Sequence, residues 1–300
     1  MPDLLDRRAV LGGLACLPLA TTPAALRAET GKERTFNLRV VMSGHSLTDP
    51  LPHPLSILVQ AAGGPKSRGM VIDRSTIPGS TAKLRWINDM NLPVYARRDI
   101  ARYDVLVLTE RVPVRSAIEW EESVDYTQKW FDHAWSKGKG GKGAETIYYA
   151  SWVDIRSGPG NTDEYDMPDE RLIPLRERLD LEMGAWQQVA DQVNAHRAKG
   201  SPRMRVIPGP KIMAAVLDAI SAGTAPGLTR IKDLFEDTIH PNAKGAYLMA
   251  VAHYAVIYGR DPRTLPNLRG EPGWPSAKQA DWMKELVWDV LRSYPDSGLT

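Results

Sequence analysis

The segment "VVMSGHSLTDPLPHPL" (residues 40–55) contains an apolar run that stops abruptly at Ser43-Gly44-His45-Ser46. An unbroken apolar run is typical of a strand buried on both faces of a parallel sheet. A Gly-x-Ser sequence directly after such a strand leaves one hydroxyl group exposed at the strand's end. Ser46 is therefore a candidate nucleophile, and the rest of the chain must supply a base that activates it.

The composition of the chain indicates an ordinary globular protein. Its 300 residues are 43% hydrophobic and 25% charged, which is enough for one α/β domain with a full core. It has 38 Lys and Arg residues against 36 Asp and Glu residues, a formal net charge of +2 at pH 7. This balance gives no sign of a polyanionic partner, so we expect no binding to nucleic acid.

The N-terminal segment, residues 1–28, has a different character from the rest. Arg7 and Arg8 precede an apolar run over residues 9–20 that is too short to anchor the chain in a membrane. The paired arginines resemble a twin-arginine export signal, with Ala28 as the cleavage point. We expect an export signal peptide over 1–28, a single domain over 29–300, a periplasmic or secreted protein and no membrane span.

The single cysteine, Cys16, lies inside the predicted export segment. After cleavage at Ala28 the mature protein would contain no disulfide, no thiolate nucleophile and no cysteine metal ligand. The alternative is that Cys16 carries a lipid and the protein is a lipoprotein.

Strand-like and helical patterns alternate along the mature chain. Helical spacing is found at residues 116–135, 171–199 and 243–258, and a last helix opens with a capping box at Ser276 and Gln279. This alternation predicts a three-layer α/β/α sandwich with right-handed crossovers. The runs that predict its strands are residues 36–43, 69–73, 103–109, 146–152 and 204–207.

Two segments interrupt this pattern. The glycine-rich residues 137–143 lack the Gly-Lys-Ser/Thr ending of a phosphate loop, so we expect a flexible, solvated turn there. Residues 155–168 follow the fourth predicted strand. A long loop in that place lies at the carboxyl edge of the sheet, where open α/β folds bind ligands.

His240 is the histidine best placed to act as a base. It stands in Asp237-Thr238-Ile239-His240-Pro241, just before a core helix. Asp237, three residues earlier, can accept a hydrogen bond from the imidazole Nδ1 and leave Nε2 free to take a proton. By itself the Asp-x-x-His pattern is equally typical of a helix-start turn with a solvated histidine. The other histidines, His45 among them, fit surface or packing positions.

Taken together, the Gly44–Asp49 segment and the Asp237-x-x-His240 segment resemble the SGNH (GDSL-type) hydrolase family. The resemblance implies an ester hydrolase with a flavodoxin-like sandwich of about five parallel strands. It also implies that Ser46 is the nucleophile and that Asp237 and His240 complete a catalytic triad. No metal or cofactor is expected, because no cluster of His, Asp and Glu has ligand spacing and a triad needs none.

The family's second motif is a glycine whose backbone N–H binds the developing oxyanion, and Gly79 matches it. The resemblance thus implies that Gly79 and Ser46 supply oxyanion donors; the alternative is a plain helix-entry turn capped by Ser80. The third motif departs from the family. Where an asparagine is usual, the sequence has Thr109-Glu110-Arg111, so the chain resembles a divergent member of the family. A charged Glu110 would repel an oxyanion, and it can contribute only if protonated or if it binds something else.

Some divergent SGNH-like groups linked with carbohydrates also have a tryptophan after the fourth strand, where this chain has Trp152. Trp152 can stack on a sugar ring, or it is a core residue that closes the strand. The resemblance implies an exported serine esterase that removes O-acyl groups, most plausibly O-acetyl groups, from a carbohydrate. Glu110 and Asp154 as an acid/base pair for glycoside cleavage, and a carbohydrate-binding protein without efficient catalysis, are the alternatives.

Overall fold

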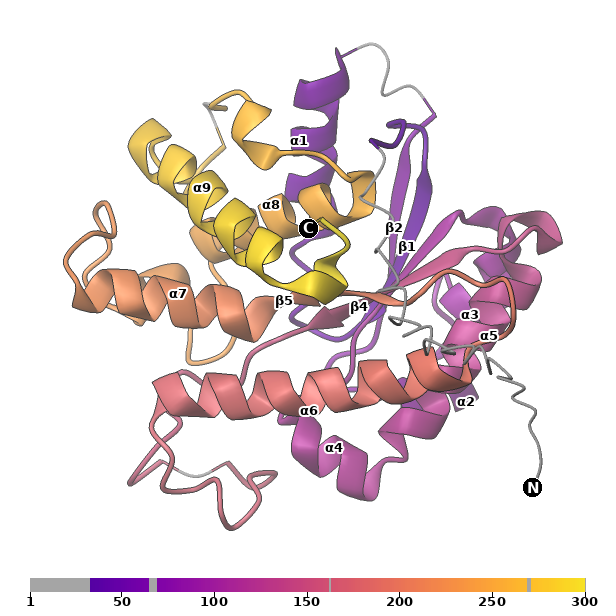
Figure 1. The fold of residues 1–300 in the computed structure, drawn as a ribbon, viewed down its shortest axis with the longest axis horizontal. Coiled ribbons are helices and arrows are strands. Elements are labelled where there is room, and N and C mark those ends of the chain that lie inside the picture. The colour runs from indigo at the N-terminus through magenta and orange to yellow at the C-terminus, as the bar shows by residue number, and fades with distance from the viewer. Residues whose placement is uncertain (1–32, 65–68, 162, 269–270, 300) are drawn as a thin grey trace, which may run out of the picture.

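The computed structural model describes residues 33–64, 69–161, 163–268 and 271–299 (Figure 1). The predicted export segment and its Cys16 lie outside the described residues. Among the described residues, no helix combines the length and the apolar character needed to cross a bilayer.

A single five-stranded sheet forms the centre of the fold, with its strands in the order β2-β1-β3-β4-β5. Every pair of neighbouring strands is parallel. The predicted sheet of five parallel strands is therefore confirmed. The strands are β1 (Arg39–Gly44), β2 (Val71–Thr76), β3 (Val105–Leu108), β4 (Glu145–Ala150) and β5 (Arg205–Pro208).

Alternate residues of the central strands enter two separate cores. Val40 and Met42 of β1 pack in one apolar cluster, whereas Val41 packs in the other. The alternation repeats in β3, where Val105 and Val107 face the first cluster. Both faces of the sheet are covered, which is why these strands are continuous apolar runs in the sequence.

Helices cover both faces and complete the three-layer sandwich (Figure 1). The first cluster lies under α1 (Pro52–Gly63), α7 (Gly209–Ser221), α8 (Ala243–Tyr258) and α9 (Ala277–Ser293). The second lies under α2 (Ala82–Ile87), α3 (Ala96–Asp99), α4 (Val114–Trp120), α5 (Ser123–Gly141) and α6 (Leu175–His196). The described residues also form 3₁₀ turns: η2 (Ile100–Arg102), η3 (Ile231–Leu234), η4 (Pro262–Thr264) and, after α9, η5 (Pro295–Ser297).

The helix predicted over residues 116–135 is two helices. α4 and α5 meet at Glu122, which has φ +53°, a left-handed conformation that a continuous helix does not allow. The capping box predicted at the start of α9 is confirmed, because the Ser276 N–H donates to Gln279 Oε1 at 3.0 Å. In the glycine-rich segment, most of which lies inside the last part of α5, Gly138 is buried against Ala144, whereas most of its neighbours are exposed.

The order of the strands places a topological switch at β1. The chain passes from β1 to β2 on one side of β1 and then to β3 on its other side. In open α/β sheets the crevice at such a switch, outside the carboxyl ends of the strands, is the usual ligand site. The loops that begin with Ser46 and with Thr109 therefore lie side by side, and the Thr109 N–H donates to Ser43 O at 3.2 Å.

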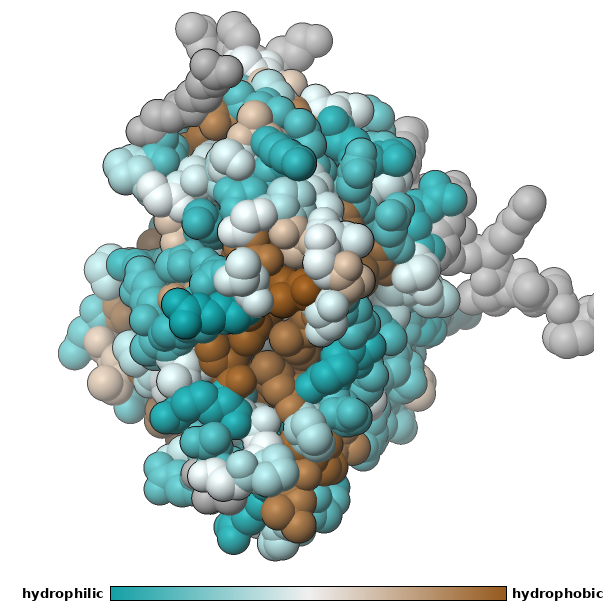
Figure 2. All heavy atoms as spheres, turned by 90° about the vertical axis from the view of Figure 1, so that its left-hand side faces the viewer, coloured by the Kyte–Doolittle hydropathy of each residue, from teal (hydrophilic) through white to brown (hydrophobic). Residues whose placement is uncertain are grey.

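The surface turned toward the viewer in Figure 2, the left-hand side of Figure 1, is uneven in character. Apolar side chains gather in a hollow near its middle, and hydrophilic side chains surround the hollow (Figure 2). Part of the apolar surface on this side is thus recessed.

Candidate active site

Ser46 lies in a turn that begins where β1 ends at Gly44. The Thr48 N–H closes the turn by donating to His45 O at 2.8 Å. A Cβ atom on Gly44 would lie 2.0 Å from Thr48 Oγ1 and 3.0 Å from Thr109 Cγ2. Only glycine permits so close a fold of the turn against the end of β3, so Gly44 fixes the path that presents Ser46.

Asp237 and His240 lie in a tight turn before α8. Asp237 Oδ1 accepts hydrogen bonds from the backbone N–H groups of Ile239 at 2.8 Å and of His240 at 2.7 Å. Asp237 Oδ2 is 2.6 Å from His240 Nδ1. Burial acts to raise the pKa of the Asp237 carboxyl, but these hydrogen bonds outweigh it and hold that pKa well below its usual range. Asp237 is thus ionised and orients the imidazole.

The turn and the end of β1 meet across 194 residues of sequence. His240 Nε2 is 2.9 Å from Ser46 Oγ, so Ser46, His240 and Asp237 form one hydrogen-bonded chain. With the Nδ1 proton directed at Asp237, Nε2 is free to accept the Ser46 proton. The His240 and Asp237 side chains are 40% and 54% exposed, so the arrangement opens directly to solvent. It has the geometry of an activated serine nucleophile.

Gly79 lies in an exposed turn between β2 and α2. Its φ is +65°, a conformation that favours glycine, and a Cβ there would meet no atom within 4 Å. The adjoining Ile77 N–H donates to Gly44 O at 3.1 Å, which ties this turn to the end of β1. Neither the Gly79 N–H nor the Ser46 N–H has a hydrogen-bond partner among the described residues. Both groups are available to a ligand.

The Glu110 side chain cannot contact a substrate, because it does not reach the surface. This corrects the expectation that Glu110 binds or acts on the substrate. Its side chain is fully buried, and Oε1 accepts hydrogen bonds from the N–H groups of Ala82 at 3.0 Å and of Arg111 at 2.7 Å. Burial raises the pKa of the Glu110 carboxyl by more than the nearby Arg85 and these two N–H groups lower it. Glu110 holds the start of α2 in place.

Trp152 and Asp154 also face inward, against the loop that carries the acid and the base. Trp152 is 1% exposed, so of the two roles that the sequence allowed it has the core role. A side chain buried to this extent cannot stack on a sugar ring. Its indole Nε1 donates to Ile239 O at 2.9 Å. Asp154 Oδ2 accepts from Thr238 Oγ1 at 2.6 Å, and the same carboxylate binds Arg156. A glycosidase pair of Glu110 and Asp154 is therefore not supported.

The segment after β4 acts as a clamp on the acid–base turn; we use "β4 clamp" for Trp152, Asp154 and Ile155. The Ile155 N–H donates to Thr238 O at 2.8 Å, the third bond between these two segments. Burial acts to raise the pKa of Asp154, but the hydrogen bonds from Arg156 and Thr238 together outweigh it and lower that pKa. Asp154 therefore stays charged. The clamp holds the middle of the turn from which Asp237 and His240 project.

His45, directly before the proposed nucleophile, has a packing role. Its Nε2–H donates to Glu110 O at 2.9 Å, and Nδ1 accepts a long bond of 3.4 Å from the Leu47 N–H. Burial, assisted by the positive charge of Arg85, lowers the pKa of His45 to about 3. A neutral His45 thus joins the turn of Ser46 to the end of β3.

Sequence reasoning did not identify Arg85 or Thr238. Arg85 is fully buried below the strand ends, although its place in a short helix gave no reason to expect it there. Thr238 stands between Asp237 and the histidine, and only its contact with the β4 clamp reveals its part. An arginine in a short helix, or a threonine between an aspartate and a histidine, does not by itself indicate a role in a site.

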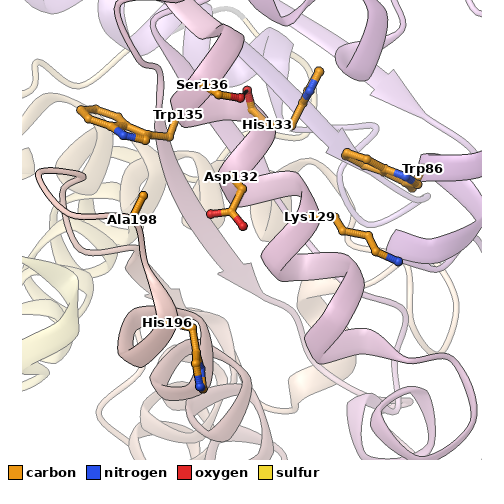
Figure 3. Close-up of a pocket in the computed structure, with 8 residues that line it drawn as sticks. All are labelled: Trp86, Lys129, Asp132, His133, Trp135, Ser136, His196 and Ala198. Carbon is orange, nitrogen blue, oxygen red and sulfur yellow. Dashed lines mark hydrogen bonds between the residues drawn. The ribbon is translucent and has the colours of Figure 1, made fainter.

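A pocket of about 530 Å³ lies apart from these residues (Figure 3). α5 supplies most of its lining, including Asp132, and His196 at the end of α6 also lines it (Figure 3). The ends of these helices lead to the amino ends of β4 and β5, the edge of the sheet opposite Ser46. Within the described part of the chain, no three His, Cys, Asp or Glu side chains are grouped to hold a metal ion.

Comparisons with protein-family models and with curated proteins find no match for this chain. Among solved structures, the chain is similar to a DUF4886 family protein from Bacteroides uniformis. That match has 14% identity and a TM-score of 0.62, and it covers 86% of this chain and 96% of the other. At this identity it shows the fold alone.

Two further solved structures match more weakly. A putative SGNH hydrolase from Slackia heliotrinireducens has 20% identity and a TM-score of 0.46, covering 72% of this chain and 97% of the other. An acetyl xylan esterase has 14% identity and a TM-score of 0.46, covering 73% and 100% of the two chains. Likenesses at this level carry no argument about activity, so the comparisons establish an α/β fold that other solved proteins share.

Proposed function

We propose that this protein is a serine hydrolase that cleaves carboxylic esters through an acyl-enzyme. The observation that carries the proposal is the hydrogen-bonded chain from Ser46 Oγ to His240 Nε2, at 2.9 Å, and from His240 Nδ1 to Asp237 Oδ2, at 2.6 Å. A serine hydroxyl is activated when a base accepts its proton and a carboxylate orients that base. These contacts supply all three groups.

In the first half of the reaction, Ser46 Oγ attacks the ester carbonyl carbon while its proton passes to His240 Nε2. The ionised Asp237 stabilises the imidazolium that forms. The N–H groups of Ser46 and Gly79 bind the oxyanion of the tetrahedral intermediate. As the intermediate collapses, His240 returns the proton to the departing alcohol. A water molecule, deprotonated by His240, then releases the acid from Ser46.

The substrate that we propose is a short acyl ester, an O-acetyl group above all, on a carbohydrate. The His240 and Asp237 side chains are 40% and 54% exposed, so a bulky alcohol can remain in solvent while its acyl group reaches Ser46. A short acyl group needs no deep pocket. The Arg7-Arg8 pattern supports export, which would bring the enzyme to extracellular polysaccharides.

The test uses the purified protein with p-nitrophenyl acetate and with an acetylated xylo-oligosaccharide. Ser46→Ala should lower kcat by at least ~1,000-fold, because the nucleophile is lost. The matched control is Ser56→Ala, which removes a hydroxyl bonded to Pro52 O at 2.8 Å on α1 and should leave kcat unchanged. A fluorophosphonate should add covalently to Ser46, as seen by mass spectrometry. Full turnover by folded Ser46→Ala would reject the mechanism.

The product analysis separates this proposal from other uses of the same fold. Release of acetate with intact glycosidic bonds supports the esterase, and shortened oligosaccharides would indicate a glycoside hydrolase. Binding of the oligosaccharide with neither product, in a wild-type protein that the fluorophosphonate does not label, would indicate a non-catalytic carbohydrate-binding protein.

A further inference from the structure

Arg85 is a fully buried cation directly behind the proposed site. It is 1% exposed and belongs to α2, the helix that follows the Gly79 turn. Arg85 Nε donates to Ser43 Oγ at 3.2 Å, and Nη1 donates to Ser80 O at 2.7 Å and Ser80 Oγ at 2.9 Å. Nη2 donates to Thr109 O. One guanidinium group thus joins the end of β1, the Gly79 turn and the end of β3.

These three segments are the ones that carry the proposed oxyanion donors and the position where a third donor is missing. Ser43 is three residues before Ser46, and Ser80 directly follows Gly79. Thr109 begins the segment after β3 that has no asparagine. Two of the residues that Arg85 binds, Ser43 and Ser80, are therefore within three residues of a proposed oxyanion donor, and the other, Thr109, lies where the family's third donor is absent.

The partners of Arg85 are unusual for a buried charge. All its hydrogen-bond acceptors among the described residues are hydroxyl or carbonyl oxygens, and none is a carboxylate. Burial lowers the pKa of Arg85 to about 10, with Glu110 as the nearest acid opposing that shift. The group stays charged at neutral pH. Burying a guanidinium without a carboxylate in contact is costly, so its presence needs a reason other than packing.

Glu110 anchors the same region from the other side. Its Oε1 accepts from the Ala82 N–H at the start of α2, while Arg85 binds Ser80 two residues earlier. These two contacts hold the Gly79 turn on its C-terminal side, and the Ile77 N–H, which donates to Gly44 O at 3.1 Å, holds it on the N-terminal side. Gly79 itself makes no bond among the described residues. A rigid support around a free N–H group is what pre-organised oxyanion binding requires.

We propose that Arg85 is a positioning residue that sets the Gly79 N–H against the Ser46 N–H and so builds a two-donor oxyanion hole that works without a side-chain amide after β3. The inference rests on the proposed function and deepens it. Arg85 acts through Ser43, Ser80 and Thr109 and does not itself touch the substrate. Its planar set of donors, rather than its charge alone, fixes the spacing of the three segments.

The decisive variant is Arg85→Lys, which keeps the charge but cannot bind three segments at once. We expect kcat for p-nitrophenyl acetate to fall by ~10- to 100-fold with KM nearly unchanged, because a small misplacement weakens transition-state binding alone. The rate of fluorophosphonate addition to Ser46 should fall in parallel. The matched control is Arg97→Lys, since Arg97 binds Trp86 O at 2.6 Å and stacks on that ring without reaching the strand ends.

Two milder variants keep the proposal testable if Arg85→Lys does not fold. Ser43→Ala removes the acceptor of Nε, and Ser80→Ala removes one acceptor of Nη1. Each should lower kcat by ~3- to 10-fold without a matching change in KM. A residue that only stabilises the fold would lower the melting temperature and leave kcat of the folded protein intact.

The outcomes distinguish failure of this inference from failure of the proposed function. If wild-type protein neither hydrolyses esters nor is labelled at Ser46, the proposed function falls and the inference falls with it. If wild-type protein is active but folded Arg85→Lys, or both serine variants, keep wild-type kcat, then only the role of Arg85 is overturned. Retained activity in Arg85→Lys would mean that charge alone suffices.

Discussion

Asp237 binds three donors inside a turn of four residues: the N–H groups of Ile239 and His240, and His240 Nδ1. These bonds lower the pKa of its carboxyl against the opposing effect of burial. The group therefore stays ionised at any pH above about 4, the ordinary pKa of an aspartate. A fixed negative charge at this point keeps the imidazole proton on Nδ1, and this is the protonation state that the reaction needs.

Asp237→Asn should lower kcat for p-nitrophenyl acetate by roughly 1,000-fold or more. The amide oxygen can still accept the two backbone N–H groups, but an NH₂ group facing Nδ1 moves the imidazole proton to Nε2. His240 then cannot accept the Ser46 proton. The matched control is Asp261→Asn, because Asp261 accepts the Arg263 N–H at 2.9 Å in a similar turn away from Ser46. A kcat within tenfold of wild type would show that the contact of Asp237 with His240 is not used.

Between elements, the main support of the acid–base turn is the β4 clamp defined above. It makes three hydrogen bonds to residues 238 and 239, the two that separate Asp237 from His240. The clamp acts on backbone and hydroxyl groups, so its loss would displace the imidazole without removing any group that reacts.

Thr238→Val tests the clamp with a side chain of nearly the same shape. We expect kcat to fall by ~3- to 10-fold with little change in KM, because His240 loses part of its orientation. The free energy of unfolding should fall by roughly 1.5–3 kcal/mol, the usual contribution of a hydrogen bond to a charged group. Thr229→Val is the control, since Thr229 Oγ1 makes a comparable bond of 3.2 Å to Asp233. Equal kinetics for both variants would argue against the clamp.

At this scale the sequence is informative about strands and much less so about side-chain direction. Continuous apolar runs predicted five parallel strands, and the pairing of Ser46 with a distant Asp-x-x-His predicted residues that the structure brings within hydrogen-bond distance. Glu110 was a candidate for contact with a substrate, because it follows the third predicted strand near the carboxyl edge of the sheet. Its inward direction depends on the start of α2, a partner that is 28 residues away in the sequence.

Across the whole molecule, a buried ionic group fixes the long loop at the carboxyl edge. Arg178 on α6 pairs with two carboxylates of the loop, Asp166 at 3.1 Å and Glu170 at 2.7 Å. It also pairs with Glu182 on its own helix, at 3.0 Å. Arg115 adds a second guanidinium, 2.9 Å from Glu170. Three buried carboxylates thus share two cations, and the loop is fastened to α6 by charge rather than by apolar packing.

Glu182 makes the stability of this arrangement depend on pH. Burial is the main reason that its pKa is raised to about 7; Arg178 and the Val114 N–H lower the pKa, and Glu170 raises it further. A carboxyl whose pKa is higher in the folded state favours folding when protonated. Its contribution is complete below the unfolded pKa of about 4.3 and is lost as the pH rises to about 7.

The free energy of unfolding of wild type, relative to Glu182→Gln, should therefore fall as the pH rises from about 4 to about 8. The whole shift, from about 4.3 to about 7, corresponds to an upper value of about 4 kcal/mol. Chemical denaturation of both proteins across this range measures the difference, in which titrating groups that do not interact with Glu182 cancel. Glu177→Gln on the same helix is the matched control, because Glu177 is exposed whereas Glu182 is buried. A difference that rises with pH would mean that the pairing of Glu182 with Arg178 outweighs its burial, and the loop would then be held best by the charged carboxylate.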